Sequence, residues 1–168
     1  MTSSKTRRTI KTRHTMRHLA ILVLGALSWA CTTTYVVPPD PIPVIGAQVF
    51  GRNGECIDVQ DGGTADGTPI VVVQCHGSPN ERWFIKSGVI SENFGSCIDV
   101  QGGAPNDGSP IVLISCTGTS SQQWSIDNGR IVGFGNKCLS ESGDSSADQT
   151  PLILLACSAR PGQLWTIR

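Results

Sequence analysis

Short apolar runs separated by polar turns dominate the pattern of this chain. The branched apolar runs fall at residues 70–73, 111–114 and 152–155. Each follows a turn that reads D-G-T-P, D-G-S-P or D-Q-T-P, with a proline where a strand can begin. Ile57 and Val59 alternate with Asp58, which places the apolar side chains on one face of a strand and the carboxylate on the other. The pattern predicts an all-β protein.

The pattern occurs three times, with a period of 41 residues, between residues 46 and 168. Each copy has a first cysteine, a second cysteine 19 residues later and a tryptophan eight residues after that. These landmarks are Cys56, Cys75 and Trp83, then Cys97, Cys116 and Trp124, then Cys138, Cys157 and Trp165. Each copy offers about four short strands, which is also the content of a propeller blade. Propellers typically have four or more blades, so three copies predict a threefold barrel with a triangular cap.

Two sets of repeated side chains are expected to be structural, and the single histidine of the repeats is expected at the surface. The tryptophans, with Ile85, Ile126 and Ile167 two residues further on, continue the period of two and are predicted to face the core. Aspartates in the turns before the apolar runs are predicted to brace those turns; they are Asp66, Asp107 and Asp148. His76 is expected in a surface loop, with a ligand contact as the alternative because Asn80 is near it in sequence.

The charge distribution bears on the kind of partner, and the cysteine content bears on the compartment in which the protein folds. Residues 1–30 hold six Lys/Arg and no acidic residue, whereas the remainder holds seven Lys/Arg and thirteen Asp/Glu, a difference of −6. An acidic body argues against nucleic acid as a partner, because that binding depends on cationic contacts with phosphate. Six of the seven cysteines fall in the repeats, which suggests disulfides and an oxidising compartment. Zinc is the rival interpretation, although the repeats contain no Cys-x-x-Cys and a single histidine.

The N-terminal part has the pattern of an export signal. Basic residues precede an apolar run at 19–27, which is too short for a bilayer that needs about twenty residues. We therefore predict an export signal over residues 1–30, with Met16 as an alternative start and a membrane anchor or buried strand as the competing interpretation. Residues 31–45 contain four prolines and are predicted to be an extended linker.

The ending S-W-A-C resembles the lipobox of bacterial lipoproteins. The resemblance implies that Cys31 is lipid-modified and becomes the first residue of a mature, membrane-anchored chain, because two acyl chains hold a protein on a membrane. An ordinary secretory signal with a free or cross-chain thiol at Cys31 is the alternative. The expected location is therefore outside the cytoplasm, either on the cell envelope or secreted.

The repeats resemble the ricin-type β-trefoil lectins. Cys-[Ile/Leu]-Asp-Val, a second cysteine 19 residues on and Q-x-W at the end of a copy are the features that carry the resemblance, over residues 46–168. It implies a β-trefoil of three 41-residue repeats, with disulfides Cys56–Cys75, Cys97–Cys116 and Cys138–Cys157. Closing a loop of this length stabilises a fold by about 3 kcal/mol.

In such lectins, each repeat can hold a sugar between an aspartate, an aromatic ring and an asparagine beside the Q-x-W glutamine. Carried onto this sequence, the polar positions are Asp58, Asn80 and Glu81 in the first repeat, and Asp99 and Gln122 in the second. For Gln122 and Gln163, bracing of the loop through hydrogen bonds to the backbone is favoured over ligand contact. For Asp58 and Asp99, local hydrogen bonding within the turn is the alternative to a ligand contact. The aromatic positions hold aliphatic side chains, namely Val73, Ile114 and Leu155. The third repeat keeps only Gln163, with Ser140 and Gly162 replacing Asp and Asn. The first repeat is thus the best candidate site.

Three classes of function can be compared with these features of the sequence. The first is a non-catalytic carbohydrate-binding module for galactose- or xylose-containing glycans, as the resemblance implies. The second is a trefoil that lost its sugar site and acts in protein interaction or structure, which the aliphatic side chains at the aromatic positions favour. The third is an enzyme, which needs a positioned acid, base or nucleophile, and no such set is visible in the sequence. We expect a monomeric binding protein that uses no cofactor and no metal.

Overall fold

The computed structural model describes residues 46–92 and 95–168. The predicted export signal, the lipidation site at Cys31 and the linker all lie outside these residues. Within the described ranges, no helix has the length and apolar character required to cross a bilayer.

The described chain consists of strands joined by turns and single 3-10 turns. Each repeat supplies four strands, as the sequence predicts. The strands are β1 (Val49–Phe50), β2 (Cys56–Val59), β3 (Thr68–Val73), β4 (Phe84–Lys86), β5 (Val89–Ser91), β6 (Ser96–Val100), β7 (Ile111–Ser115), β8 (Ser125–Asp127), β9 (Arg130–Gly133), β10 (Lys137–Glu141), β11 (Thr150–Ala156) and β12 (Thr166–Ile167).

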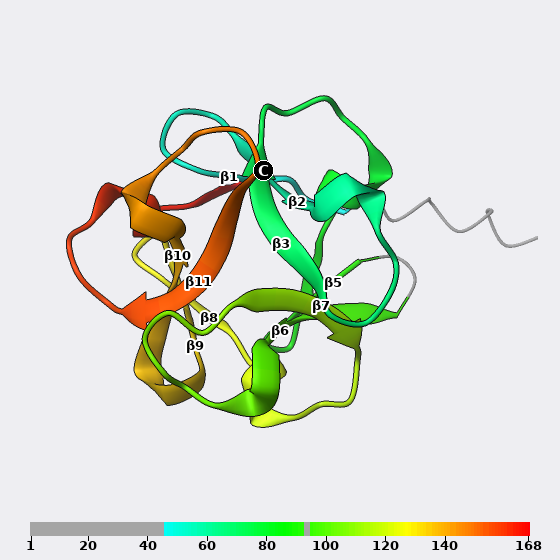
Figure 1. Ribbon diagram of the computed structural model, residues 1–168, viewed down its shortest axis with the longest axis vertical. Coiled ribbons are helices and arrows are strands. Elements are labelled where there is room, and N and C mark those ends of the chain that lie inside the picture. Colours follow the sequence, from blue (N-terminus) through cyan, green and yellow to red (C-terminus); the bar gives the residue numbers. More distant parts are fainter. Residues whose placement is uncertain (1–45, 93–94) are drawn as a thin grey trace, which may run out of the picture. The chain divides into compact units, whose positions relative to one another are not determined.

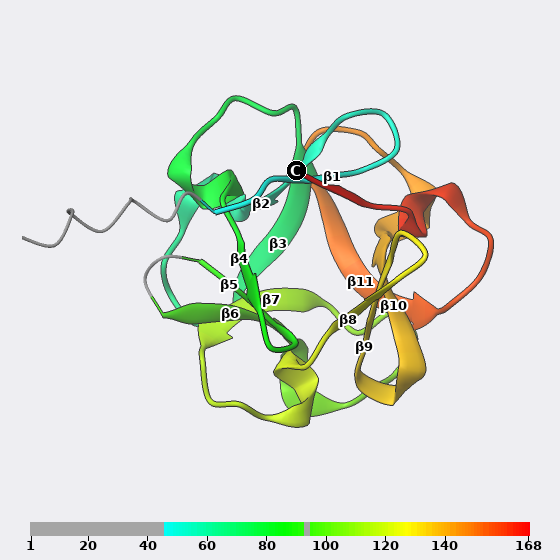
Figure 2. The ribbon, with the colours of Figure 1, turned by 180° about the vertical axis from the view of Figure 1, so that it is seen from behind.

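A triangular cap closes one end of the molecule. The long strands β3, β7 and β11 converge around the threefold axis (Figure 1). Strand β3 pairs with β7 through Pro69↔Val112 and with β11 through Val71↔Pro151, and the bridge Pro110↔Ile153 completes the triangle. The hairpins β4–β5 and β8–β9, with the pair β12–β1, lie on the opposite side from the cap and form the barrel, which faces the viewer in Figure 2. The prolines thus lie where the three cap strands pair with one another. Strand β3 begins at Thr68, one residue before Pro69, and β11 begins at Thr150, one residue before Pro151.

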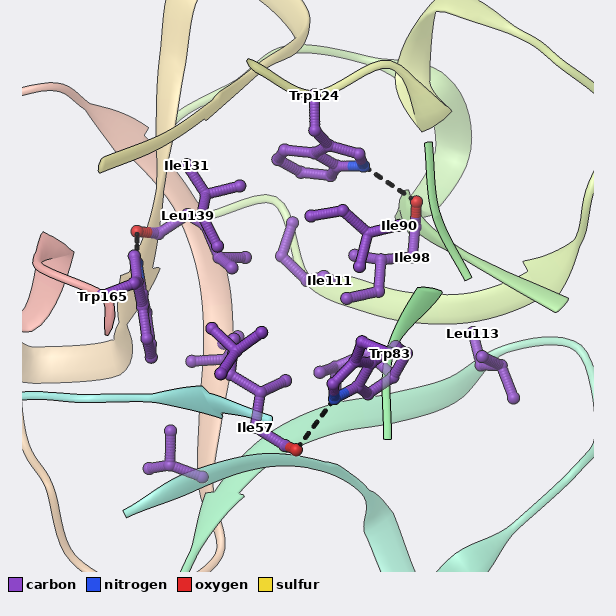
Figure 3. Close-up of a cluster of buried hydrophobic side chains, with 14 of the residues drawn as sticks. Ile57, Trp83, Ile90, Ile98, Ile111, Leu113, Trp124, Ile131, Leu139 and Trp165 are labelled. Atoms are coloured by element: carbon purple, nitrogen blue, oxygen red, sulfur yellow. Dashed lines mark hydrogen bonds between the residues drawn. The ribbon is translucent and has the colours of Figure 1, made fainter. Parts of the chain in front are cut away.

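The three tryptophans fill the core between cap and barrel, as predicted. They are at most 5% exposed and pack with the isoleucines, valines and leucines of all three repeats. Each indole Nε1 donates to the backbone carbonyl of the apolar residue that follows the first cysteine of its repeat. These bonds join Trp83 to Ile57 at 3.0 Å, Trp124 to Ile98 at 3.0 Å and Trp165 to Leu139 at 3.2 Å (Figure 3). The apolar ring is buried while its one polar group keeps a partner, which a buried tryptophan requires.

The predicted disulfides are confirmed. The three disulfides are Cys56–Cys75, Cys97–Cys116 and Cys138–Cys157. Each joins a cysteine in β2, β6 or β10 to a cysteine in the loop after β3, β7 or β11. All six repeat cysteines are consumed in this way, so the zinc interpretation of these cysteines is wrong.

One of the isoleucines predicted to be buried is not. Ile126 is 51% exposed, whereas Ile85 and Ile167 pack against the core. Ile126 is paired with the buried Ile131 and so shares its face, but all three residues of β8 are exposed at that end of the hairpin. The period of two predicts the face on which a side chain lies, but not how far along the strand the core extends.

Candidate functional site

A polar cavity lies beside the β2–β3 hairpin of the first repeat. Its volume is about 370 Å³. The residues that line it are Asp58, Asp61, Gly62, Val73, His76, Ser78, Asn80 and Gln149. The structure thus brings together two of the residues predicted for a sugar site, Asp58 and Asn80, and adds polar groups that the sequence reasoning did not assign.

Asp58 forms the floor of this cavity. It is carried by β2, with Ile57 and Val59 pointing into the core on the opposite face, and it is 2% exposed. Asn80 donates a hydrogen bond from Nδ2 to Asp58 Oδ1. Burial raises the pKa of Asp58 and the nearby Glu81 carboxylate adds to the rise, while the hydrogen bond from Asn80 lowers it.

Val73 occupies the position at which the family pattern places an aromatic ring. It is 5% exposed, so the floor beside Asp58 is aliphatic. The aromatic ring that does line the cavity is the imidazole of His76, whose side chain is 55% exposed. His76 lies in an exposed loop, as predicted, and its ring also lines the cavity that contains Asp58 and Asn80.

Asp61 and Gln149 line the cavity from turns that other repeats build with glycine. Both have left-handed backbones, with φ of 54° and 62°. The equivalent positions are glycines in the other two repeats: Gly102 and Gly143 for Asp61, and Gly67 and Gly108 for Gln149. A side chain in this conformation costs about 1–2 kcal/mol, so both are strained exceptions at one site. The sequence signal was the change from D-G to D-Q in the third turn.

Glu81 lies beneath the loop that carries His76 and is fully buried. Its Oε1 accepts from the backbone N–H of His76 at 2.8 Å, and its Oε2 accepts from the backbone N–H of Gly77 at 2.8 Å and from Gln48 Nε2 at 2.9 Å. In this structure Glu81 therefore braces the loop from below, and it is not among the lining residues of the cavity.

In the second repeat, the candidate residues Asp99 and Gln122 bind each other. Gln122 Nε2 donates to Asp99 Oδ2 at 2.9 Å and to the carbonyl of Ser115 at 3.0 Å, while its Oε1 accepts from the backbone N–H groups of Thr117 and Gly118. The third repeat has the same arrangement, in which Gln163 Nε2 donates to Ser140 Oγ at 2.9 Å. The glutamine of Q-x-W therefore braces the loop in both repeats, which is the role that the sequence favoured over ligand contact.

Comparison with known proteins agrees with this architecture. The sequence model of one protein family, the ricin-type beta-trefoil lectin domain, matches residues 46–165. No curated protein matches the chain in sequence.

Several solved structures share the fold. The designed threefold-symmetric protein ThreeFoil is 23% identical, with a TM-score of 0.65 over 72% of this chain and 96% of its own. The agglutinin from Abrus precatorius is 28% identical, with a TM-score of 0.65 over 72% of this chain and 47% of its own. A non-toxic homologue of type II RIPs from Momordica charantia, in complex with α-methyl-D-galactoside, is 24% identical, with a TM-score of 0.63 over 72% of this chain and 46% of its own. The chain thus spans about half the length of the two plant proteins.

The family model covers most of the chain, and the repeats, the disulfides and the buried tryptophans agree with it. The chain belongs to the family of ricin-type β-trefoil lectin domains.

Proposed function

We propose that this protein is a non-catalytic carbohydrate-binding module whose sugar site is the first-repeat cavity. The observation that carries the proposal is the gathering of polar groups around one cavity. Asp58, Asp61, His76, Ser78, Asn80 and Gln149 all line it. A sugar presents many hydroxyl groups that need directional partners, and a few convergent polar groups in a cavity supply them.

The apolar part of a sugar needs a different contact. Val73 provides an aliphatic floor, and the half-exposed ring of His76 provides a flat surface at the edge of the cavity. Asp58 then accepts hydrogen bonds from sugar hydroxyls, with Asn80 holding its other oxygen in place. The family supports galactose- or xylose-containing glycans as the ligand class.

The second repeat is a weaker candidate. Asp99 Oδ2 already accepts a hydrogen bond from Gln122, whereas Asp58 Oδ2 accepts none from the described residues. We expect any sugar bound there to contact Asp99 less extensively than one bound at Asp58.

A protein-interaction trefoil is the second candidate function. It is favoured by Val73, Ile114 and Leu155, which leave no repeat with an aromatic platform at the expected position. Sugar affinity decides between the two functions.

The test is a glycan array probed with the full chain, purified with its disulfides intact. Asp58→Ala should weaken binding by at least about tenfold, because a hydrogen bond to a charged group is worth about 1.5–3 kcal/mol. Asp99→Ala is the matched control, since it removes the equivalent carboxylate from the second repeat and should leave most of the binding in place.

Each variant is first shown to keep the near-UV circular dichroism of its buried tryptophans. A folded wild-type chain that binds no glycan would reject the lectin proposal in favour of protein interaction. Equal losses for Asp58→Ala and Asp99→Ala would reject the placement of the site in the first repeat.

We further propose that the protein is exported and anchored through a lipid on Cys31. The three disulfides support an oxidising compartment. In a bacterial host, the wild-type chain should partition with membranes, and its first residue should be an acylated Cys31 by mass spectrometry. Cys31→Ala should release the protein from the membrane fraction. A soluble wild-type chain cleaved before Cys31 but carrying a free thiol would show an ordinary secretory protein instead.

A further inference from the structure

The first repeat differs from the other two at the residue that begins Q-x-W. Gln122 and Gln163 use the amide NH₂ to donate to the side chains of Asp99 and Ser140. Glu81 occupies the equivalent position and has no hydrogen to donate when ionised. The first repeat therefore places a second carboxylate next to Asp58 where the other repeats place a hydrogen-bond donor.

Both carboxylates are buried, and one oxygen is left without a partner. Asp58 is 2% exposed and Glu81 is fully buried. Asn80 binds Asp58 Oδ1, but no described residue donates a hydrogen bond to Asp58 Oδ2. A buried, unpaired charged oxygen is unfavourable, and a like charge beside it makes the arrangement worse.

His76 completes a cluster with these two carboxylates. Its Nε2 lies 3.6 Å from Asp58 Oδ2 and its Nδ1 lies 3.3 Å from Glu81 Oε1. Among the described residues, His76 is the only basic side chain in ion-pair contact with either carboxylate. One ligand atom from each of the three residues lies within 4.8 Å of the other two.

We propose that Asp58, His76 and Glu81 bind a divalent transition-metal ion, with Zn²⁺ as the best match. Zinc takes histidine nitrogen and carboxylate oxygen at about 2.0–2.2 Å, so its tetrahedral ligands lie roughly 3.3 Å apart. Nε2 of His76 lies 3.6 Å from Asp58 Oδ2, and the three residues offer ligand atoms within 4.8 Å of one another, so movement of the half-exposed His76 side chain would bring the ligands to that spacing. Calcium and magnesium prefer oxygen ligands, so the histidine argues against them.

The surrounding residues orient the cluster. Ser78 Oγ lies 2.5 Å from His76 Nδ1, so that nitrogen can donate to the hydroxyl while Nε2, on the Asp58 side, receives the metal. Glu81 is held by the backbone N–H groups of His76 and Gly77 but keeps a free lone pair on Oε1. Three protein ligands leave the fourth position of a tetrahedral zinc ion to water or another ligand.

Zn²⁺ titrated into chelator-treated full chain by isothermal calorimetry, without any glycan, tests the proposal on its own. We expect saturable binding with a dissociation constant of about 10 μM or lower. The thermal midpoint should rise with added Zn²⁺ because the metal binds the folded state. Neither readout depends on the proposed sugar binding.

Glu81→Gln is the decisive variant, because glutamine stands at the equivalent positions in the other repeats and the fold accommodates it there. It should weaken the site by at least about a hundredfold, since even residues that only orient metal ligands contribute about 10–100-fold. His76→Ala should do the same, and Asp99→Asn should change nothing. His14, His18 and Cys31 are further possible ligands in the full chain, so only the binding lost in Glu81→Gln is assigned to this cluster. Equal Zn²⁺ binding by wild type and Glu81→Gln, or no uptake by the wild type, would overturn the proposal.

Discussion

At the scale of single residues, Glu141 is a buried acid without a compensating cation bonded to it. It is 1% exposed and lies near Glu55, which is 7% exposed. None of the described residues donates a hydrogen bond to either oxygen of Glu141. Burial and the neighbouring carboxyl of Glu55 together raise the pKa of Glu141 to about 8, so the folded protein holds a proton there at neutral pH.

This raised pKa makes stability depend on pH. The unfolded chain ionises the same group near its ordinary value of 4.5. The stabilising contribution of the bound proton is therefore complete below that pH and is lost as the pH rises through about 8. Glu141→Gln copies the protonated form, so it should raise the thermal midpoint at pH 9 and leave it nearly unchanged at pH 4.

Thermal unfolding followed by circular dichroism between pH 4 and 9 checks this expectation. Asp127→Asn, which removes an equal charge from the exposed strand β8, is the control and should keep the wild-type pH dependence. A Glu141→Gln protein whose midpoint falls with pH as steeply as the wild type would show that another group is responsible.

At the scale of elements, three turn aspartates tie each repeat to the next. Asp66 Oδ1 accepts from the backbone N–H of Ser115 at 2.8 Å, Asp107 Oδ1 accepts from that of Ala156 at 3.0 Å, and Asp148 Oδ1 accepts from that of Gln74 at 3.0 Å. The first repeat thus caps a strand end of the second, the second caps the third, and the third caps the first. The prediction that these aspartates are structural is correct, and the hydrogen bonds that the described residues show run from each aspartate to the neighbouring repeat.

Removing one of these ties should loosen the closure of the ring. Asp66→Ala leaves the backbone N–H of Ser115 without its acceptor, and we expect the thermal midpoint to fall by a few degrees. Asp127→Ala is the control, because that carboxylate accepts a side-chain bond only from the adjacent Asn128 among the described residues. An unchanged midpoint for Asp66→Ala would mean that the strands of the cap hold the repeats together without the tie.

At the scale of the whole molecule, the core is threefold and the surface is not. The indole bond, the disulfide and the cap pairing recur in each repeat with the same partners. Several departures from symmetry lie in or beside one cavity, although Glu141, which replaces the core residues Val59 and Val100, does not line it. Asp61 and Gln149 replace glycines there, and Glu81 replaces glutamine. Both proposals, for sugar and for metal, concern this one asymmetric region.

The sequence alone determined the repeat, the strand content and the identity of the buried tryptophans. Each of these follows from local pattern, because side chains alternate across a strand and a repeated unit folds the same way each time. The disulfide pairs followed from the resemblance to a family. Where the pattern was wrong, at Ile126, the cause was the extent of the core, which depends on the neighbouring repeats.

Only the tertiary structure brought together the residues of the candidate site in the first repeat. Asp58 is on β2, whereas His76, Asn80 and Glu81 follow β3, and Gln149 comes from the third repeat. Pairing of β2 with β3 and of β3 with β11 brings these residues to one cavity. Burial then makes the carboxylates of Asp58 and Glu81 matter to each other, because charges withdrawn from water interact far more strongly than the same charges on a surface.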